Sequence, residues 1–239
     1  MKTFILIFVL SLLCPNGILQ EKADRHPACA PLASGSGQIT PAGEVSRTDT
    51  LFTFQGDTAG SLPPGWTTAL TGRGKPCRWQ IVNDHGNKVL AQVSAETPDY
   101  RFNLAVFNNV VVKDVSISVR FKAIRGRGDR GGGPVWRYRD AGNYYVARAN
   151  PLENNFRLYK VVNGSRHMLK SASFRIESDK WYNLKVTMRG NRIRCYFNGK
   201  LELETTDNTF SKGGKVGLWT KSDAVTWFDD MRLTCLDSK

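Results

Sequence analysis

Residues 192–205, with the sequence RIRCYFNGKLELET, decide the fold, because they have the pattern of two strands joined by a tight turn. Asn198-Gly199 suits a two-residue type I′ turn, in which both central residues need a positive φ. Apolar side chains alternate along the first strand at Ile193, Cys195 and Phe197. Successive side chains of a strand point to opposite faces, so the pattern predicts a hairpin with this face buried. The opposite face carries Arg192, Arg194 and Tyr196.

The remainder of the chain after residue 50 repeats this pattern in short alternating runs separated by Gly, Asn, Asp and Pro. We expect strands at residues 78–82, 88–93, 102–107, 115–121, 136–138, 144–149, 156–162, 181–188, 192–197, 200–205, 215–219 and 225–233. No stretch of a dozen residues has a convincing helical period. Short strands at this spacing predict an all-β sandwich of two packed sheets.

The first 20 residues have the features of a signal peptide. Lys2 gives a positive start, and residues 4–13 form an apolar run broken only by Ser11. This run has the length of a signal-peptide core and is too short to span a bilayer. We therefore expect export, to a secreted or periplasmic location. Cys14 follows Leu13, where a lipoprotein signal usually has a small residue, so lipidation is the weaker alternative.

The region that follows the leader divides into two parts. Residues 21–50 are rich in Ala, Pro, Gly, Ser and Thr and predict a flexible linker, and residues 51–239 form the expected domain. Four cysteines remain after the leader, Cys29, Cys77, Cys195 and Cys235. Four cysteines allow three pairings, and all three stay open.

The net charge of +13 lies entirely in residues 51–239, because the first 50 residues hold equal numbers of basic and acidic residues. Such a charge indicates anionic surroundings, which could be acidic glycans, an anionic cell surface or nucleic acid; the alternative is a basic domain without a charged ligand. A basic, aromatic domain would also suit single-stranded nucleic acid, but export argues against that partner. No segment after the leader is apolar enough to span a membrane.

Four stretches resemble the concanavalin A-like (laminin G-like) domains of bacterial exported proteins. They are residues 51–84 (LFTFQGDTAGSLPPGWTTALTGRGKPCRWQIVND), 135–150 (VWRYRDAGNYYVARAN), 179–204 (DKWYNLKVTMRGNRIRCYFNGKLELE) and 214–233 (GKVGLWTKSDAVTWFDDMRL). The resemblance implies a jelly-roll sandwich of two antiparallel sheets. It leaves function open, because lectins, glycosidases and adhesion modules share this fold.

Catalysis by the route used in related enzymes is not supported by the sequence. Family 16 glycoside hydrolases of this fold carry acids spaced approximately Glu-x-Asp-x-x-Glu on one strand, and this motif is absent here. The nearest approach is Glu202-Leu203-Glu204, which follows a tight turn and is expected to face water. A glycoside-cleaving enzyme with a non-standard acid site therefore stands only as an alternative function.

Residues 134–151, PVWRYRDAGNYYVARANP, are the candidate binding strip, because rings and polar groups alternate along them. Alternation predicts that Trp136, Tyr138 and Asp140 share one side of the first strand, with Arg137 on the other. The candidate ligand-binding residues are Trp136, Arg137, Tyr138, Asp140, Tyr144, Arg148, Asn150 and Arg157. The competing interpretation is that the rings fill the core while the arginines pair with acids.

A basic glycine-rich loop and two aspartates are further candidate sites. The loop 124–133, IRGRGDRGGG, is expected to be exposed and mobile, and its Arg127-Gly128-Asp129 spells an adhesion tripeptide. The resemblance also allows a structural Ca²⁺ held by Asp57 and Asp229, with no other cofactor. The leading hypothesis is an exported, non-catalytic carbohydrate-binding domain; a structural or adhesion module is the remaining alternative.

Overall fold

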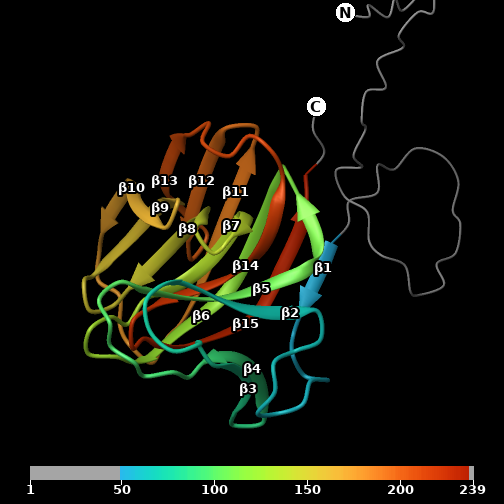
Figure 1. Cartoon of the computed structure of the whole chain (residues 1–239), viewed down its shortest axis with the longest axis vertical. Helices are drawn as coiled ribbons and strands as arrows, with labels where there is room; N and C mark the ends of the chain where they lie inside the picture. Colours follow the sequence, from blue (N-terminus) through green and yellow to red (C-terminus); the bar gives the residue numbers. More distant parts are fainter. Residues whose placement is uncertain (1–48, 237–239) are drawn as a thin grey trace, which may run out of the picture.

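A computed structural model describes residues 49–236, and the expected signal peptide and nearly all of the expected linker lie outside these residues. The described part is all β (Figure 1). Its strands are β1 (Asp49–Phe52), β2 (Trp66–Gly72), β3 (Trp79–Asp84), β4 (Asn87–Gln92), β5 (Arg101–Val112), β6 (Val115–Arg125), β7 (Gly132–Asp140), β8 (Asn143–Asn150), β9 (Asn155–Val162), β10 (Ser165–Ser173), β11 (Trp181–Arg189), β12 (Arg192–Phe197), β13 (Lys200–Thr206), β14 (Gly214–Lys221) and β15 (Val225–Cys235). The first strand begins at Asp49, two residues before the expected start of the domain.

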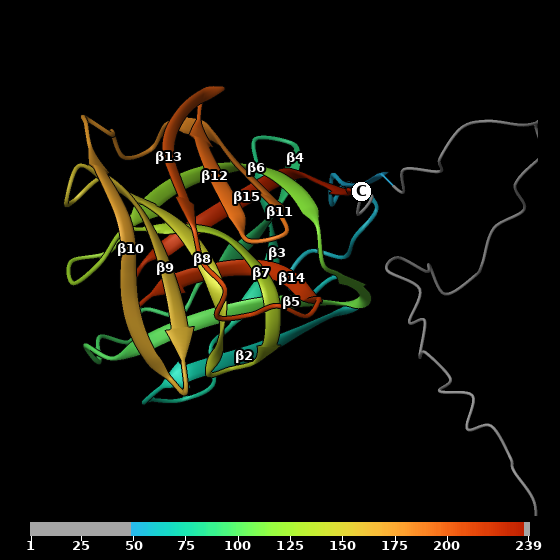
Figure 2. The ribbon, with the colours of Figure 1, turned by 90° about the horizontal axis from the view of Figure 1, so that it is seen from above.

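The strands form two antiparallel sheets that lie one over the other (Figure 2). The eight-stranded sheet has the order β13-β12-β11-β6-β15-β4-β3, and its eighth strand is β1. Strand β4 pairs with the first half of β15, and β1 pairs with the second half. The seven-stranded sheet has the order β10-β9-β8-β7-β14-β5-β2. The predicted jelly-roll sandwich of two antiparallel sheets is therefore confirmed.

All twelve expected strands are present, and β1, β2 and β10 were missed. Strand β10 was not predicted because it is an edge strand with a bulge between Met168 and Lys170, so its sequence lacks a clear alternation of apolar and polar residues. Met168 and Lys170 are both exposed, which leaves the strand without the buried apolar face that the other strands have.

The hairpin of β12 and β13 has the predicted turn and the predicted faces. Asn198 and Gly199 both have positive φ, 47° and 83°. Ile193, Cys195 and Phe197 are buried in the core, whereas the three alternating polar residues point outward. The two-residue period was enough to decide these faces because the one bulge in this pairing inserts its extra residue in β13 and leaves β12 uninterrupted.

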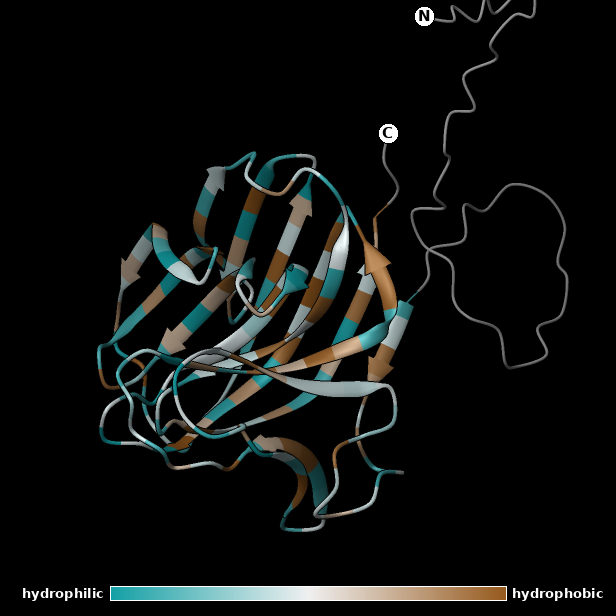
Figure 3. Cartoon of the chain, in the orientation of Figure 1, coloured by the Kyte–Doolittle hydropathy of each residue, from teal (hydrophilic) through white to brown (hydrophobic). Residues whose placement is uncertain are grey.

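The main core lies between the two sheets. It contains the inward side chains of both sheets, among them Trp79, Phe121, Leu184, Leu218 and Phe228. Hydrophobic and hydrophilic bands accordingly alternate along the strands in Figure 3. A second apolar cluster lies on the opposite, outer face of the seven-stranded sheet. Its members are Phe102, Leu104, Val106, Val135, Tyr144, Val146, Tyr159, Val161 and Trp219.

Three of the cysteines can be described. Cys77 and Cys195 are buried free thiols. Each of the three pairings left open by the sequence would place both of these cysteines in disulfides, so none of the three is formed. Cys235 is disulfide-bonded. Burial raises the pKa of both free thiols, which keeps them protonated and unreactive at neutral pH.

Candidate functional site

Strand β7 changes face in its middle. Arg137 has a φ of 46°, and two residues of β7 lie opposite one residue of β14 at this point, which is a β-bulge. Trp136 is fully buried between the sheets, where its Nε1 donates to Sδ of Met188 at 3.1 Å. Tyr138 lies on the opposite face. The expectation that Trp136, Tyr138 and Asp140 share one side is therefore wrong, because the bulge breaks the alternation.

Arg137 donates to backbone carbonyls of three separate segments. Its side chain is buried and donates from Nε to the carbonyl of Lys113 at 3.1 Å and from Nη2 to that of Gly190 at 2.6 Å. Nη1 donates to the carbonyl of Phe210, and Asp114 lies 3.4 Å from Nη2. Since every side-chain nitrogen is engaged within the protein, Arg137 ties these segments together, and the ligand-binding role predicted for it stays a prediction.

Strands β8 and β9 bring the other predicted polar residues together on the outer face of the seven-stranded sheet. Tyr144, Arg148 and Asn150 alternate along β8 on this face, as expected. Across the ladder, Arg157 of β9 lies opposite Arg148, and Asn155 lies opposite Asn150. The short turn between the strands therefore ends next to four polar side chains.

Glu153, in that turn, is the centre of the cluster. Its carboxylate accepts both terminal nitrogens of Arg148, at 3.1 and 3.0 Å, and one from Arg157 at 2.7 Å. The side-chain amides of Asn150 and Asn155 also donate to it, at 3.1 and 3.0 Å. The hydrogen bonds from Arg148, followed by those from Asn155, lower the pKa of Glu153 to about 2, against the effect of burial. We call Arg148, Asn150, Glu153, Asn155 and Arg157 the Glu153 cluster.

The Glu153 cluster has a buried base and a solvent-facing rim. The side chain of Arg148 is only 1% exposed, whereas those of Glu153 and Arg157 are 38% and 32% exposed. Beneath them, Asp129 is fully buried and lies 3.1 Å from Arg148, with Lys221 at 3.7 Å. Arg148 therefore has two carboxylate partners, which offset the cost of burying its charge.

The glycine-rich loop before β7 is exposed at Arg127 and Gly128, as expected, but it is anchored to the domain through its backbone. The carboxylate of Asp223 accepts the backbone N–H groups of Arg127, Gly128 and Asp129, at 2.6 to 3.2 Å. Such a nest of successive N–H groups fixes the loop around an anion. Because the Asp129 side chain is buried against Arg148, the tripeptide at 127–129 does not present its acid as an adhesion motif would.

Aromatic rings adjoin the Glu153 cluster on the same face. The guanidinium carbon of Arg148 lies 5.9 Å from the ring centroid of Tyr159, and Arg157 Nη1 lies 3.5 Å from its hydroxyl. The hydroxyl of Tyr144, further along the face, contacts Nε1 of Trp219 at 3.3 Å. These groups form an apolar floor with polar atoms along one end.

The far end of β7 contributes little to this cluster. Tyr138 stacks on Tyr144 with ring centroids 6.0 Å apart, so it belongs to the aromatic part of the face. Asp140 is exposed and accepts from the backbone of Gly142 and the side chain of Asn143, which caps the β7–β8 turn. The structure thus places Asp140 away from the cluster formed by Arg148, Asn150 and Arg157.

Residues 60–234 match the sequence model of the 3-keto-alpha-glucoside-1,2-lyase-like domain, and this match covers well over half of the chain. The chain belongs to this family. The lyase-like domain is also 26% identical over 155 residues to levanase of Bacillus subtilis (strain 168). That match covers 62% of this chain and 20% of levanase, so the chain spans about a fifth of the curated relative it matches.

Solved structures resemble the lyase-like domain in fold. The carbohydrate binding module CBM66 from Bacillus subtilis superposes with a TM-score of 0.56 at 23% identity, covering 70% of this chain and 94% of the module. The β-glucanase of Bacillus licheniformis gives 0.55 at 14% identity, covering 79% and 98%. The predicted concanavalin A-like jelly roll is confirmed in this glucanase-type form, whereas the laminin G-like subtype stays a prediction.

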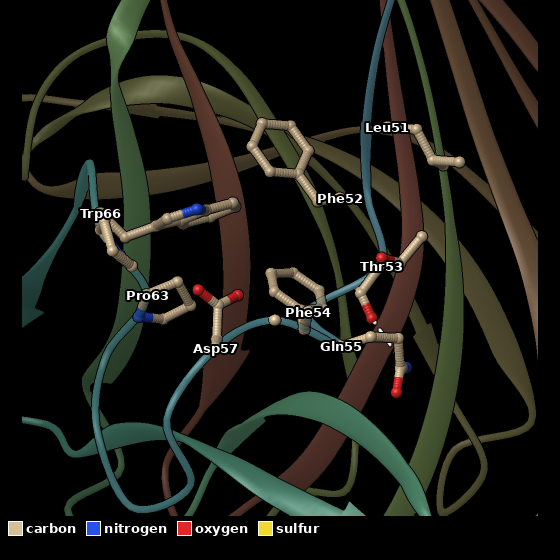
Figure 4. Close-up of a pocket in the computed structure, with 10 residues that line it drawn as sticks. Leu51, Phe52, Thr53, Phe54, Gln55, Asp57, Pro63 and Trp66 are labelled. Atoms are coloured by element: carbon tan, nitrogen blue, oxygen red, sulfur yellow. Dashed lines mark hydrogen bonds between the residues drawn. The ribbon is translucent and has the colours of Figure 1, made fainter.

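The calcium site proposed at Asp57 and Asp229 stays a prediction. Asp229 is buried and accepts from Nδ2 of Asn87 at 2.8 Å. Asp57 lies beside Phe54 and Pro63 at a surface pocket of about 290 Å³ (Figure 4). Within residues 49–236, no group of three or more His, Cys, Asp or Glu side chains is placed to hold a metal ion.

The acidic pair Glu202 and Glu204 of the lyase-like domain has basic partners. Glu204 accepts from Arg192 and, at 3.1 Å, from Arg194, and these hydrogen bonds lower its pKa. Glu202 pairs with Lys200 at 3.0 Å. A general acid for glycoside hydrolysis needs a raised pKa, so the environment of Glu204 does not suit it to that role.

Sequence reasoning missed several residues at this site of the lyase-like domain. Glu153 lies in a turn, where alternation gives no information, although its position between Asn150 and Asn155 is a usable signal. Tyr159 shares a face with Arg157, and this relation was visible in the sequence. Trp219 could be assigned only once the order of β14 in the sheet was known.

Proposed function

We propose that the chain is a carbohydrate-binding domain, and that the sugar binds on the outer face of the seven-stranded sheet at the Glu153 cluster. The observation that carries the proposal is a set of pre-positioned charged and amide groups next to buried aromatic rings, with Glu153 and Arg157 accessible to solvent. Small-molecule sites combine apolar walls with a few precisely held polar groups. Sugars match this combination, because one molecule presents both hydroxyls and C–H faces.

The division between base and rim suggests how binding would work. Arg157 and Glu153 are accessible and would exchange hydrogen bonds with sugar hydroxyls. Arg148, Asn150 and Asn155 are buried and hold Glu153 in place. Charge-assisted hydrogen bonds are about twice as strong as neutral ones, so a small rim suffices for orientation.

The comparisons support the proposal without deciding it. One similar structure is named a carbohydrate binding module, and the curated relative is a levanase of which this chain matches a fifth. The family is named after an activity on a keto-glucoside, which is itself a sugar derivative. All three names concern carbohydrates.

A matched pair of variants tests the proposal. Wild-type protein, Arg157→Ala and Arg175→Ala would be compared by affinity electrophoresis on a panel of neutral and acidic polysaccharides. Arg175 is a suitable control because it also pairs with a glutamate, Glu177, but is 84% exposed and outside this face. We expect Arg157→Ala to weaken retardation about tenfold. Equal retardation of both variants, or no retardation of wild type, would overturn the proposal.

Cleavage of a 3-keto-glucoside is the second candidate function, and the family match is the observation that favours it. Elimination next to a ketone requires a base that abstracts a proton. The accessible carboxylate of the cluster, Glu153, has a pKa of about 2 and is a weak base. Incubation with a 3-keto-glucoside, using wild type and Glu153→Gln, decides this: product formed by wild type and lost in the variant would establish the activity.

We also propose export, on the basis of the apolar run at residues 4–13 behind Lys2. N-terminal sequencing of protein recovered from the periplasm or medium of expressing cells tests it. Cleavage near residue 20 is the expected result, and retention of Met1 in recovered protein would count against it.

A further inference from the structure

Arg166, on the edge strand β10, lies over the aromatic floor of the outer face. Its guanidinium carbon is 4.4 Å from the ring centroid of Tyr159, 5.0 Å from that of Phe102 and 5.9 Å from that of Trp219. A guanidinium within about 6 Å of a ring face is attracted by the ring quadrupole. Three rings therefore hold one cation in the middle of the face.

Unlike the arginines of the Glu153 cluster, Arg166 lacks a counter-ion. Arg148 is paired with Asp129 and Glu153, and Arg157 is paired with Glu153. Within residues 49–236 no carboxylate lies within ion-pair distance of Arg166, and its buried Nη1 has no hydrogen-bond partner. A partly buried guanidinium without an acceptor is costly unless something supplies one.

The backbone around Arg166 is held firmly. The hydroxyl of Tyr100 accepts from the backbone N–H of Arg166 at 3.1 Å and donates to the carbonyl of Gly164 at 2.5 Å. The Tyr100 ring also packs on Phe102, with centroids 5.0 Å apart. The position of Arg166 is therefore fixed from both sides of the sheet edge, as a residue that orients a ligand requires.

Arg166 and the Glu153 cluster are close enough to meet one ligand. The guanidinium groups of Arg148 and Arg166 both lie within 6 Å of the centre of the Tyr159 ring. One residue of a glycan laid across this part of the outer face, above the buried Tyr159 ring, would meet the accessible Glu153 and Arg157 at one end and Arg166 at the other. The excess of +13 in residues 51–239 favours the approach of an anion.

Building on the proposed function, we propose that Arg166 selects for uronic acids, binding the sugar carboxylate while the Glu153 cluster binds its hydroxyls. The planar guanidinium presents parallel N–H groups that match the two oxygens of a carboxylate. Asp129 and Glu153 already pair with the arginines of the cluster. The guanidinium of Arg166 is therefore the group that would pair with an anionic substituent of the sugar.

The test compares one polymer in neutral and carboxylated form. Affinities for polygalacturonate, its methyl ester and a sulfated neutral polysaccharide would be measured by calorimetry for wild type, Arg166→Gln, Arg166→Lys and Arg232→Gln. Arg232 is the matched control, since it is exposed on the strand β15 of the other sheet. We expect wild type to prefer polygalacturonate over its ester by about ten- to a hundredfold, and Arg166→Gln to reduce this ratio to about one.

The remaining outcomes separate this inference from the proposed function. Equal affinity of wild type for polygalacturonate and its ester would overturn the inference and leave carbohydrate binding in place. If Arg166→Gln kept the wild-type ratio of affinities for polygalacturonate and its ester, the inference would also be overturned. The same holds if wild type bound the sulfated polymer as tightly as polygalacturonate, because this would indicate attraction by charge alone. Absence of binding to any polymer would overturn both. Arg166→Lys keeps the positive charge but lacks the parallel N–H groups of the guanidinium, so it is expected to retain only part of the preference for polygalacturonate over its ester.

Discussion

The carboxylate of Glu153 accepts both terminal nitrogens of Arg148, with Nη1 on Oε1 at 3.1 Å and Nη2 on Oε2 at 3.0 Å. This bidentate pair joins a solvent-facing acid to a buried arginine. Each group fixes the other, because the fork of the guanidinium admits few orientations of the carboxylate. Glu153, at the rim of the proposed site, is thus held in place by the buried Arg148, which the ligand would not contact.

Replacing Glu153 by Gln is expected to destabilise the protein and weaken glycan binding together. Arg148 would keep only Asp129 as a charged partner, and lost charge-assisted hydrogen bonds are worth about 1.5–3 kcal/mol. Chemical denaturation of wild type, Glu153→Gln and Glu177→Gln measures the difference. Glu177 is a matched control because it is 40% exposed and pairs with Lys180. Equal losses in both variants would contradict this view of the cluster.

The stability supplied by Glu153 is expected to depend on pH. Hydrogen bonds from Arg148 lower its pKa from an ordinary value of 4.5 to about 2. A lowered folded-state pKa stabilises the fold fully above the unfolded-state value, and this stability is lost as the pH falls from about 4.5 to about 2. The difference in melting temperature between wild type and Glu153→Gln should therefore shrink over this range. Asp207 also has a pKa of about 2, but its contribution to the pH dependence cancels in this difference because both proteins contain it.

Trp136 is expected to matter for stability and not for ligand binding. It fills the core between the sheets and stacks on Tyr145, with centroids 5.6 Å apart. Truncation to Ala should cost about 3–5 kcal/mol, as for other buried aromatic residues. Trp181→Ala, at a half-buried surface position, should cost less. Trp136→Phe provides a milder variant, and a folded Trp136→Phe that loses glycan binding would refute the assignment to the core.

Arg137→Met is expected to destabilise the protein by about 3–5 kcal/mol, the usual result of removing one partner of a buried ionic network. The variant leaves the carbonyls of Lys113, Gly190 and Phe210 without their donor. The neighbouring Arg139→Met is the control, because that exposed side chain only stacks on Phe210 and should cost about 1 kcal/mol or less. Urea denaturation distinguishes the two, and similar midpoints would show that Arg137 does not tie these turns together.

The sequence was informative wherever side chains strictly alternate. The faces of β12 and β8 follow from a period of two, which placed Ile193 inside and Arg148 outside. The same rule failed at Arg137, because a bulge inserts one residue and reverses the faces beyond it. Bulges depend on the partner strands, and the sequence of β7 alone contains no mark of one.

The candidate site was predicted only in part, for a related reason. Arg148, Asn150 and Arg157 lie on strands and could be assigned to one face. Glu153 lies in a turn, and Arg166 reaches the same face from an edge strand that has no clean period. Convergence of separate strands on one surface is a property of sheet order, and local pattern does not contain it.

The bulge at Arg137 also divides β7 into two segments with different tolerance to change. Residues 132–136 are fully enclosed, and Gly214 of β14 already leaves no room for a Cβ beside the backbone of Arg137. Tyr138 and the residues after it face outward. A library randomised at 138 and 139, with Asp140 kept because it caps the following turn, should therefore diversify the surface while the folding of the sandwich is preserved. This makes the half-strand a practical starting point for engineering new recognition.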